Sequence, residues 1–229
     1  MMPSIRPLGD SAAIVQWDED DKEILRSVRQ LTDRLWRLSG TDSASCISAI
    51  VPAFRSVVVH FELGRISYSE AAERIRETLK QATIDTESPQ RLIEIPVCFD
   101  APFASDLDEV AQLHGIETEE LIRRFCDAEY SVRMIGFSPG FPYLSGLPPE
   151  LETPRRSSPR LKVPQGSVAI GGCQAGIYSL ETPGGWNIIG RTPVRLFTAE
   201  LAQPCLLMAG DRVRFIRIQA EQFDRRQDE

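Results

Sequence analysis

The chain has 229 residues, 42% of them hydrophobic, so it can bury one large core or two modest ones without help from disulfides or metals. Its net charge is −7, and residues 1–128 carry 14 Lys and Arg against 23 Asp and Glu, which argues against nucleic acid as a partner. No stretch approaches the roughly 20 apolar residues of a membrane span, and the first residues lack a signal peptide's apolar core, so we expect no membrane partner and a cytoplasmic location.

The first predicted elements are a short strand at residues 12–15 and a helix after the acidic residues 18–21. Apolar residues in the helix recur at spacings of 4, 3, 4 and 3, which is typical of one buried helical face: Ile24, Val28, Leu31, Leu35 and Leu38. Such a face needs a sheet to cover.

Two apolar, β-branched runs at residues 47–51 and 57–61 predict neighbouring strands. Ser67-x-x-Glu70 has the spacing of a capping box and begins a second predicted helix. The buried stripe of that helix is predicted at Ala72, Ile75, Leu79 and Ala82. Two helices on one face of a small sheet indicate a small α+β N-terminal domain, which we assign to residues 1–88.

Residues 89–229 are predicted to form a second domain. It begins with a strand at residues 92–97, followed by short helices at 106–113 and 118–127 on either side of Gly115.

The composition then changes, because nine of the 16 prolines and ten of the 15 glycines lie between residues 136 and 193. Long helices are excluded there, and short strands joined by ordered loops remain. With a last strand at residues 211–216, the pattern predicts a β-barrel.

Residues 136–140 fit the G-x-S-x-G pattern of a serine-hydrolase nucleophile elbow. Pro139 prevents the helix that should begin at Ser138, and both histidines of the chain, His60 and His114, precede the serine although that mechanism needs one after it. We therefore interpret the segment as a rigid turn, His60 as an ordinary strand residue and His114 as a helix-terminal residue.

Phosphate-loop and metal motifs are also missing from the sequence. No G-x-x-x-x-G-K-[ST] occurs, and residues 171–176 lack both the lysine and the following helix of a phosphate cradle. The five cysteines are scattered without a C-x-x-C pair, so we expect reduced thiols, no disulfide framework and no metal site.

The most concentrated signal is a series of segments rich in glycine, proline, arginine and aromatic residues, which predicts ordered binding loops. These segments are residues 137–144, Thr153-Pro154-Arg155-Arg156, Pro159-Arg160, residues 163–172, Gln174–Tyr178 and residues 182–193, with Trp186, Arg191 and Thr192 in the last. The apolar residues of the first segment are too numerous to be left exposed, so we expect them to line a pocket or to contact a partner.

These segments, together with residues 8–12 and 51–56, resemble the family that contains the B-type subunit of 5-oxoprolinase, allophanate hydrolase subunit 1 and the Kip-type inhibitor of a sporulation histidine kinase. The resemblance implies an α+β N-terminal domain followed by a cyclophilin-like β-barrel domain. It implies an ATP-dependent enzyme that opens the lactam ring of 5-oxoproline to give glutamate, with ATP and Mg held by the assembled complex. The implied partners are the homologous C-type subunit, the LamB/YcsF-like A-type subunit and the substrate 5-oxoproline.

Eight residues match the family's motifs and carry the expected site. We expect Arg155, Arg156, Arg160 and Arg191 to bind anionic groups and stabilise charge, because a guanidinium offers two parallel hydrogen bonds to carboxylate or phosphate. We expect Gln174, Tyr178, Trp186 and Thr192 to contact the substrate. Two alternatives stay open at this point, a regulatory inhibitor that binds a histidine kinase and an allophanate hydrolase subunit.

Overall fold

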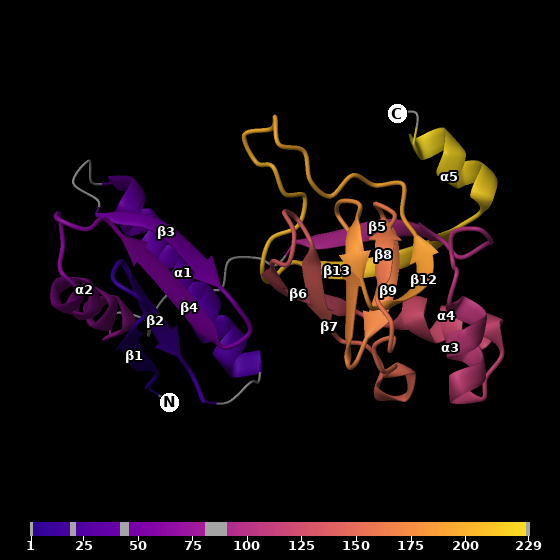
Figure 1. The fold of residues 1–229 in the computed structure, drawn as a ribbon, viewed down its shortest axis with the longest axis horizontal. Coiled ribbons are helices and arrows are strands. Elements are labelled where there is room, and N and C mark those ends of the chain that lie inside the picture. Colours follow the sequence, from indigo (N-terminus) through magenta and orange to yellow (C-terminus); the bar gives the residue numbers. More distant parts are fainter. Residues whose placement is uncertain (1, 19–21, 42–45, 81–90, 228–229) are drawn as a thin grey trace. The chain divides into compact units, whose positions relative to one another are not determined.

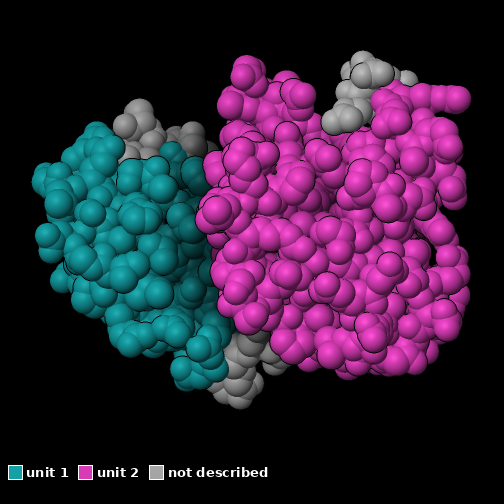
Figure 2. Space-filling model, turned by 45° about the vertical axis from the view of Figure 1, so that its right-hand side comes forward, with its two compact units in different colours: residues 1–89 teal, residues 90–229 magenta. Residues whose placement is uncertain are grey.

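The computed structural model describes residues 2–18, 22–41, 46–80 and 91–227 of the chain (Figure 1). The chain divides into two units, Met1–Pro89 and Gln90–Glu229, which have separate colours in Figure 2. Among the described helices, none combines the length and the apolar character needed to cross a membrane.

The first unit contains a four-stranded antiparallel sheet in the order β1-β2-β4-β3. Its strands are β1 (Ser4–Pro7), β2 (Ala12–Gln16), β3 (Ile47–Pro52) and β4 (Ser56–Phe61). Alternate residues of β4, namely Val57, Val59 and Phe61, are buried, as expected for a strand with one face on the core. The sequence analysis missed β1, because this mostly exposed edge strand has no apolar alternation.

Two helices complete the core of this unit, α1 (Lys22–Thr41) and α2 (Tyr68–Lys80). The predicted stripe of α1 is buried from Ile24 to Leu35, but Leu38 is 53% exposed. Including Leu38 was wrong, because the buried stripe ends one turn earlier and residues 36–38 are all exposed.

Helix α2 begins with the predicted capping box. The main-chain N–H of Ser67 donates to Glu70 Oε2 at 2.8 Å, and the Ser67 hydroxyl accepts from the Glu70 N–H at 3.3 Å. Ala72 and Ile75 are buried as predicted, Leu79 is partly buried, and the predicted Ala82 lies outside the described residues.

The second unit is built on a closed barrel of seven strands in the order β10-β7-β6-β13-β5-β12-β9, which confirms the predicted α+β fold with a β-barrel (Figure 1). Its strands are β5 (Leu92–Cys98), β6 (Tyr130–Ile135), β7 (Pro142–Ser145), β9 (Ser167–Gly171), β10 (Gln174–Ile177), β12 (Asn187–Arg191) and β13 (Arg212–Ile218). Strands β5 and β13 run parallel, from the pair Leu92 and Arg212 to the pair Cys98 and Ile218, so the last strand closes the barrel against the first.

Three helices pack against the barrel: α3 (Leu107–His114) contacts β12, α4 (Thr118–Asp127) contacts β13, and α5 (Ala220–Gln227) contacts β5. Gly115 ends α3 with φ +64°, a left-handed conformation that suits glycine, so the two predicted helices around it are confirmed. A short helix, η1 (Pro149–Leu151), follows β7.

A two-stranded ribbon of β8 (Arg160–Val163) and β11 (Thr182–Gly184) stands apart from the barrel sheet. Its register pairs Arg160 with Gly184, so the arginine-rich and the glycine-rich loops are brought side by side. This juxtaposition forms one wall of the pocket that follows.

Candidate functional site

A pocket with a cavity volume of about 210 Å³ lies where the predicted binding loops meet. Its lining consists mainly of aromatic rings, two arginines and small or cyclic residues: Phe137, Phe141, Tyr143, Arg155, Arg156, Pro159, Tyr178, Gly184, Gly185 and Trp186. Four of the eight predicted site residues are among them, Arg155, Arg156, Tyr178 and Trp186. We call this the aromatic pocket.

The aromatic rings of the pocket pack edge to face. Phe141 lies at its centre, with its ring centroid 5.3 Å from that of Tyr178 and 5.7 Å from that of Trp186, at interplanar angles of 80° and 81°. Tyr143 contacts both Phe141 and Trp186 in the same way, at 4.9 and 5.8 Å. Edge-to-face pairs contribute about 0.5–1.5 kcal/mol each beyond their buried area, so the rings form a rigid wall before any ligand binds.

Glycines make room for these rings. A Cβ atom on Gly171 would lie 2.5 Å from Trp186 Cε2, and one on Gly184 would lie 2.7 Å from Tyr178 Cε1. Real Cβ atoms do not approach other atoms so closely, so both positions require glycine. The glycine-rich sequence around residue 171 therefore serves to seat an indole ring.

Arg155 and Tyr178 give the pocket its polar character. The Arg155 guanidinium carbon lies 5.7 Å from the centre of the Trp186 ring, which leaves the N–H groups at the guanidinium edge available. Burial raises the pKa of Tyr178, although a main-chain hydrogen bond from Trp186 opposes this shift. The Tyr178 hydroxyl therefore stays protonated at neutral pH and can donate a proton in a hydrogen bond.

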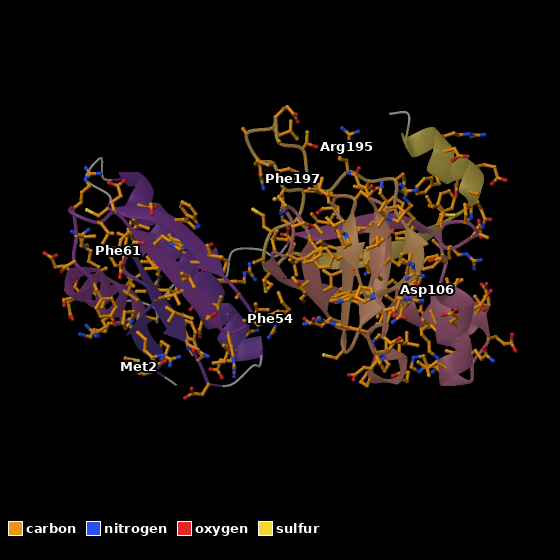
Figure 3. All side chains as sticks on the ribbon, viewed as in Figure 1. Met2, Phe54, Phe61, Asp106, Arg195 and Phe197 are labelled. Carbon is orange, nitrogen blue, oxygen red and sulfur yellow. The ribbon has the colours of Figure 1, made fainter. Side chains whose placement is uncertain are left out.

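Arg156 and Arg160 share one buried carboxylate, that of Asp106, which is labelled beside α3 in Figure 3. Arg156 Nη1 donates to Asp106 Oδ1 at 2.9 Å and Arg160 Nη2 donates to the same atom at 2.5 Å. Asp106 Oδ2 accepts a third hydrogen bond, at 2.7 Å, from the Ile188 N–H of β12. One carboxylate thus ties the start of α3, the arginine loops and the barrel wall together.

Sequence reasoning missed Asp106, because an aspartate just before a helix is the ordinary choice for an N-cap. Its side chain makes no capping bond in the structure and turns instead to the two arginines. Arg160 was expected to bind anions, but it does not line the aromatic pocket and its charge is directed at Asp106. Only the tertiary fold brings these three residues together.

The other three predicted residues do not line the pocket either. Arg191 Nε donates to the carbonyl of Gln165 at 2.7 Å, and its guanidinium lies 5.8 Å from the ring centre of Phe223 in α5. Thr192 is buried, and its hydroxyl accepts from the Val194 N–H at 3.1 Å. Gln174 is partly buried at the start of β10. Arg191 thus holds the segment at Gln165 against the barrel, whereas the Thr192 hydroxyl makes a local contact within its own segment.

The G-x-S-x-G segment forms a rigid turn at the edge of the pocket, as predicted. Phe137 has φ +67°, and the Ser138 N–H donates to the Gly136 carbonyl at 2.8 Å, which describes a three-residue γ-turn. A bulky residue in this conformation costs about 1–3 kcal/mol. The Ser138 hydroxyl lies 3.3 Å from that of Ser179, with no helix after it, so the segment lacks the form of a nucleophile elbow.

Neither histidine lines the aromatic pocket. His60 is a partly buried residue of β4 in the first unit, as predicted. His114 ends α3, and its Nε2 lies 3.0 Å from the Thr153 hydroxyl. Among the described residues, no group of three His, Cys, Asp or Glu side chains is arranged to hold a metal ion.

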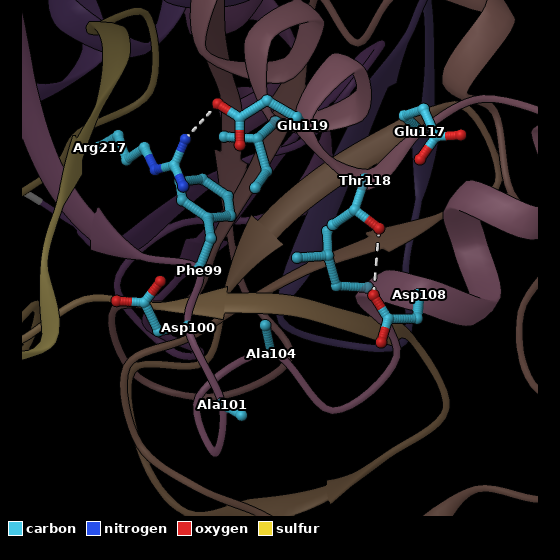
Figure 4. A pocket seen from close by; sticks show the side chains of 11 residues that line it. Phe99, Asp100, Ala101, Ala104, Asp108, Glu117, Thr118, Glu119 and Arg217 are labelled. Carbon is cyan, nitrogen blue, oxygen red and sulfur yellow. Dashed lines mark hydrogen bonds and ion pairs between the residues drawn. The ribbon is translucent and has the colours of Figure 1, made fainter.

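A larger pocket, of about 420 Å³, lies between the segment that follows β5, helices α3 and α4, and Arg217 of β13 (Figure 4). Carboxylates dominate its rim, since Asp100, Asp108, Glu117 and Glu119 line it with a single cation, Arg217. Arg217 Nη1 donates to Glu119 Oε1 at 2.5 Å, a pair marked by a dashed line in Figure 4. A ligand with a carboxylate would be repelled there, so the aromatic pocket is the better candidate for such a ligand.

Comparison with known proteins supports the sequence resemblance. Residues 3–207 match the family described as carboxyltransferase domain, subdomain C and D. The B-type subunit of 5-oxoprolinase from Bacillus subtilis (strain 168) is 38% identical to this chain over 229 residues, 96% of this chain and 94% of the relative. The protein of the same name in Escherichia coli O157:H7 is 40% identical over 185 residues, 80% of this chain and 84% of the relative.

A solved structure shares the fold. The crystal structure of TTHA0988 in space group P212121 matches with a TM-score of 0.79 at 30% sequence identity. The match covers 95% of this chain but 41% of TTHA0988, so the chain spans about two fifths of that longer protein.

Proposed function

Because the chain belongs to the carboxyltransferase subdomain C and D family and, within it, to the family of the B-type subunit of 5-oxoprolinase, we propose that it is one subunit of a cytoplasmic, ATP-dependent 5-oxoprolinase. In that reaction water adds to the ring carbonyl carbon of 5-oxoproline, the ring C–N bond breaks, the nitrogen takes up a proton, and L-glutamate results. An unstrained amide is a poor electrophile, which is why the reaction is coupled to ATP.

The observation that supports this proposal most strongly is the pairing of aromatic walls with Arg155 in one small pocket. The substrate is a compact ring with two flat faces and one carboxylate. Its faces suit the aromatic wall around Phe141, and its carboxylate suits the guanidinium N–H groups of Arg155, which lies over the Trp186 ring. In this proposal Tyr178 donates a hydrogen bond to the ring carbonyl oxygen.

Arg156 has a second role in the proposal. Its charge is partly balanced by Asp106 at 2.9 Å and by Glu109 at 3.4 Å, yet it still lines the pocket. It therefore adds positive potential beside Arg155, but part of its guanidinium is already engaged by these two carboxylates. The two arginines favour an anionic ligand in a chain whose net charge is −7.

The pocket supplies binding groups, and we propose that partner subunits supply the remaining chemistry. No Ser, Cys, His, Lys, Asp or Glu lines the aromatic pocket in the described residues, so a general base and a nucleophile must come from elsewhere. The chain has no phosphate loop, and the space over Gly171 is filled by Trp186. We therefore propose that ATP and Mg are held by the complex that this chain forms with the homologous C-type subunit and the LamB/YcsF-like A-type subunit.

Arg155→Ala is expected to raise the KM of the assembled enzyme for 5-oxoproline about tenfold or more, because a lost hydrogen bond to a charged group costs roughly 1.5–3 kcal/mol. Steady-state kinetics on the complex would measure the effect. Lys162→Ala is the matched control, since Lys162 is a neighbouring but exposed cation that pairs with Glu181 at 3.0 Å. Equal KM values for the Arg155 variant and the wild type would contradict this role.

A further inference from the structure

We infer that Phe137 is a specificity-determining residue of the aromatic pocket, which selects the closed lactam ring over open-chain acids such as the product. The inference rests on the proposed function. Three observations carry it: the backbone conformation of Phe137, the exposure of its ring, and the position of that ring beside Phe141 and Tyr178.

The backbone of Phe137 is held in an unfavourable conformation by its neighbours. Its φ of +67° belongs to the left-handed region, which glycine adopts readily and phenylalanine rarely does. The Ser138 N–H bonds to Gly136, and the buried Ser179 donates from its hydroxyl to the Pro139 carbonyl at 2.6 Å. Glycine at position 137 would remove the strain, so the aromatic side chain has a role that glycine cannot fill.

The ring of Phe137 contributes little buried surface to the core. The residue is 61% exposed, whereas Phe141 beside it is 2% exposed. Its ring centroid lies 5.4 Å from that of Phe141 and 6.2 Å from that of Tyr178, in both cases edge to face. The ring therefore stands at the open side of the aromatic wall and lines the pocket with exposed apolar surface.

The chemistry of this position discriminates between ligands by shape and charge. A five-membered lactam can lay an uncharged, flat face against the exposed ring and gain apolar contact. The open-chain product carries a second carboxylate, which would lose hydration against an apolar ring without a partner there. Phe137 thus favours binding of the ring and release of the product.

Two variants distinguish the effect of the Phe137 ring from the effect of its strained backbone. Phe137→Gly removes both, and Phe137→Ala removes the ring but keeps a side chain at positive φ. In the assembled enzyme we expect both variants to raise KM for 5-oxoproline ~3- to 10-fold with little change in kcat, since one aromatic contact is lost. We also expect both variants to discriminate less between product and substrate, so that the ratio of the inhibition constant of glutamate to the KM for 5-oxoproline becomes lower.

Thermal unfolding of the isolated chain distinguishes a role of Phe137 in binding from a role in stabilising the fold, because the two roles predict different melting temperatures for the variants. We expect the Gly variant to melt at or above the wild-type temperature and the Ala variant to melt below the Gly variant. Leu113→Ala is the control, because Leu113 is 60% exposed and lies on α3, outside the aromatic pocket.

Unchanged KM in both Phe137 variants of an active complex would overturn this inference while leaving the proposed function intact, and so would a Gly variant that melts well below the wild type. Absence of 5-oxoproline turnover by the complete wild-type complex would instead refute the proposed function, and this inference with it.

Discussion

Asp106→Ala is expected to lower the free energy of unfolding by about 3 kcal/mol, because it removes the buried carboxylate that Arg160 pairs with and leaves Arg156 with only the exposed Glu109. The Asp106 side chain is 2% exposed, while those of Arg156 and Arg160 are 30% and 25% exposed. Water reaches the arginines in part, so the lower end of the usual range applies. The substitution also leaves the Ile188 N–H without its acceptor.

Chemical denaturation of the isolated chain, followed by circular dichroism, would measure this loss. Glu109→Ala is the matched control, since Glu109 pairs with the same Arg156 at 3.4 Å but its side chain is 73% exposed. We expect that control to change stability by about 0.5 kcal/mol or less. Similar stability of the Asp106 and Glu109 variants would mean that the buried carboxylate does not hold the arginine loops.

Gly171→Ala is expected to reduce both stability and activity, because its Cβ would overlap the indole ring of Trp186. Overpacking of this kind costs roughly 1–3 kcal/mol. The ring can escape only by moving away from Gly171, and displacing the pocket wall by an ångström or so is enough to lower kcat/KM about tenfold or more.

Gly172→Ala is the comparison for this prediction, because the two glycines are adjacent but differ in surroundings. Apart from its own chain neighbours, no heavy atom in the part of the chain that the structure describes lies within 4 Å of a Cβ at Gly172, whose φ is +66°. Alanine there is expected to cost about 1 kcal/mol for its left-handed backbone and to leave kcat/KM unchanged. Melting and kinetics on both variants test the idea, and equal kinetic losses would show that the Trp186 position is not what matters.

Much of the fold could be predicted from local sequence. The 3.6-residue spacing from Ile24 to Leu35 predicts which face of α1 is buried, and the apolar, β-branched run at residues 57–61 predicts a strand; both are confirmed. The capping box at Ser67 and the left-handed end of α3 at Gly115 were equally readable, because caps depend on residues close together in the chain.

The pairing of distant segments could not be predicted in this way. Strands β5 and β13 run side by side although about 120 residues separate Arg212 from Leu92, and no local pattern encodes a parallel partner so far along the chain. The carboxylate of Asp106 similarly accepts hydrogen bonds from Arg156 and Arg160, which lie about 50 residues further along the chain.

For the same reason the candidate site was predicted only in part. A shared motif identifies which arginines are present, but the direction of each guanidinium depends on what the fold places beside it. Arg155 stacks on Trp186 at the pocket, Arg160 pairs with Asp106, and Arg191 bonds to the Gln165 carbonyl. Motif matching alone assigned these three side chains the same role.

The measurement that tests the account most directly is ATP-dependent glutamate release from 5-oxoproline by purified subunits in defined combinations. The combinations are this chain alone, the homologous C-type subunit with the LamB/YcsF-like A-type subunit, and all three together. We predict glutamate release only from the complete set, because among the described residues no Ser, Cys, His, Lys, Asp or Glu lines the aromatic pocket, and we propose that the partner subunits depend on that pocket. Release by this chain alone at the rate of the complex, or an equal rate from the partners without it, would contradict the account.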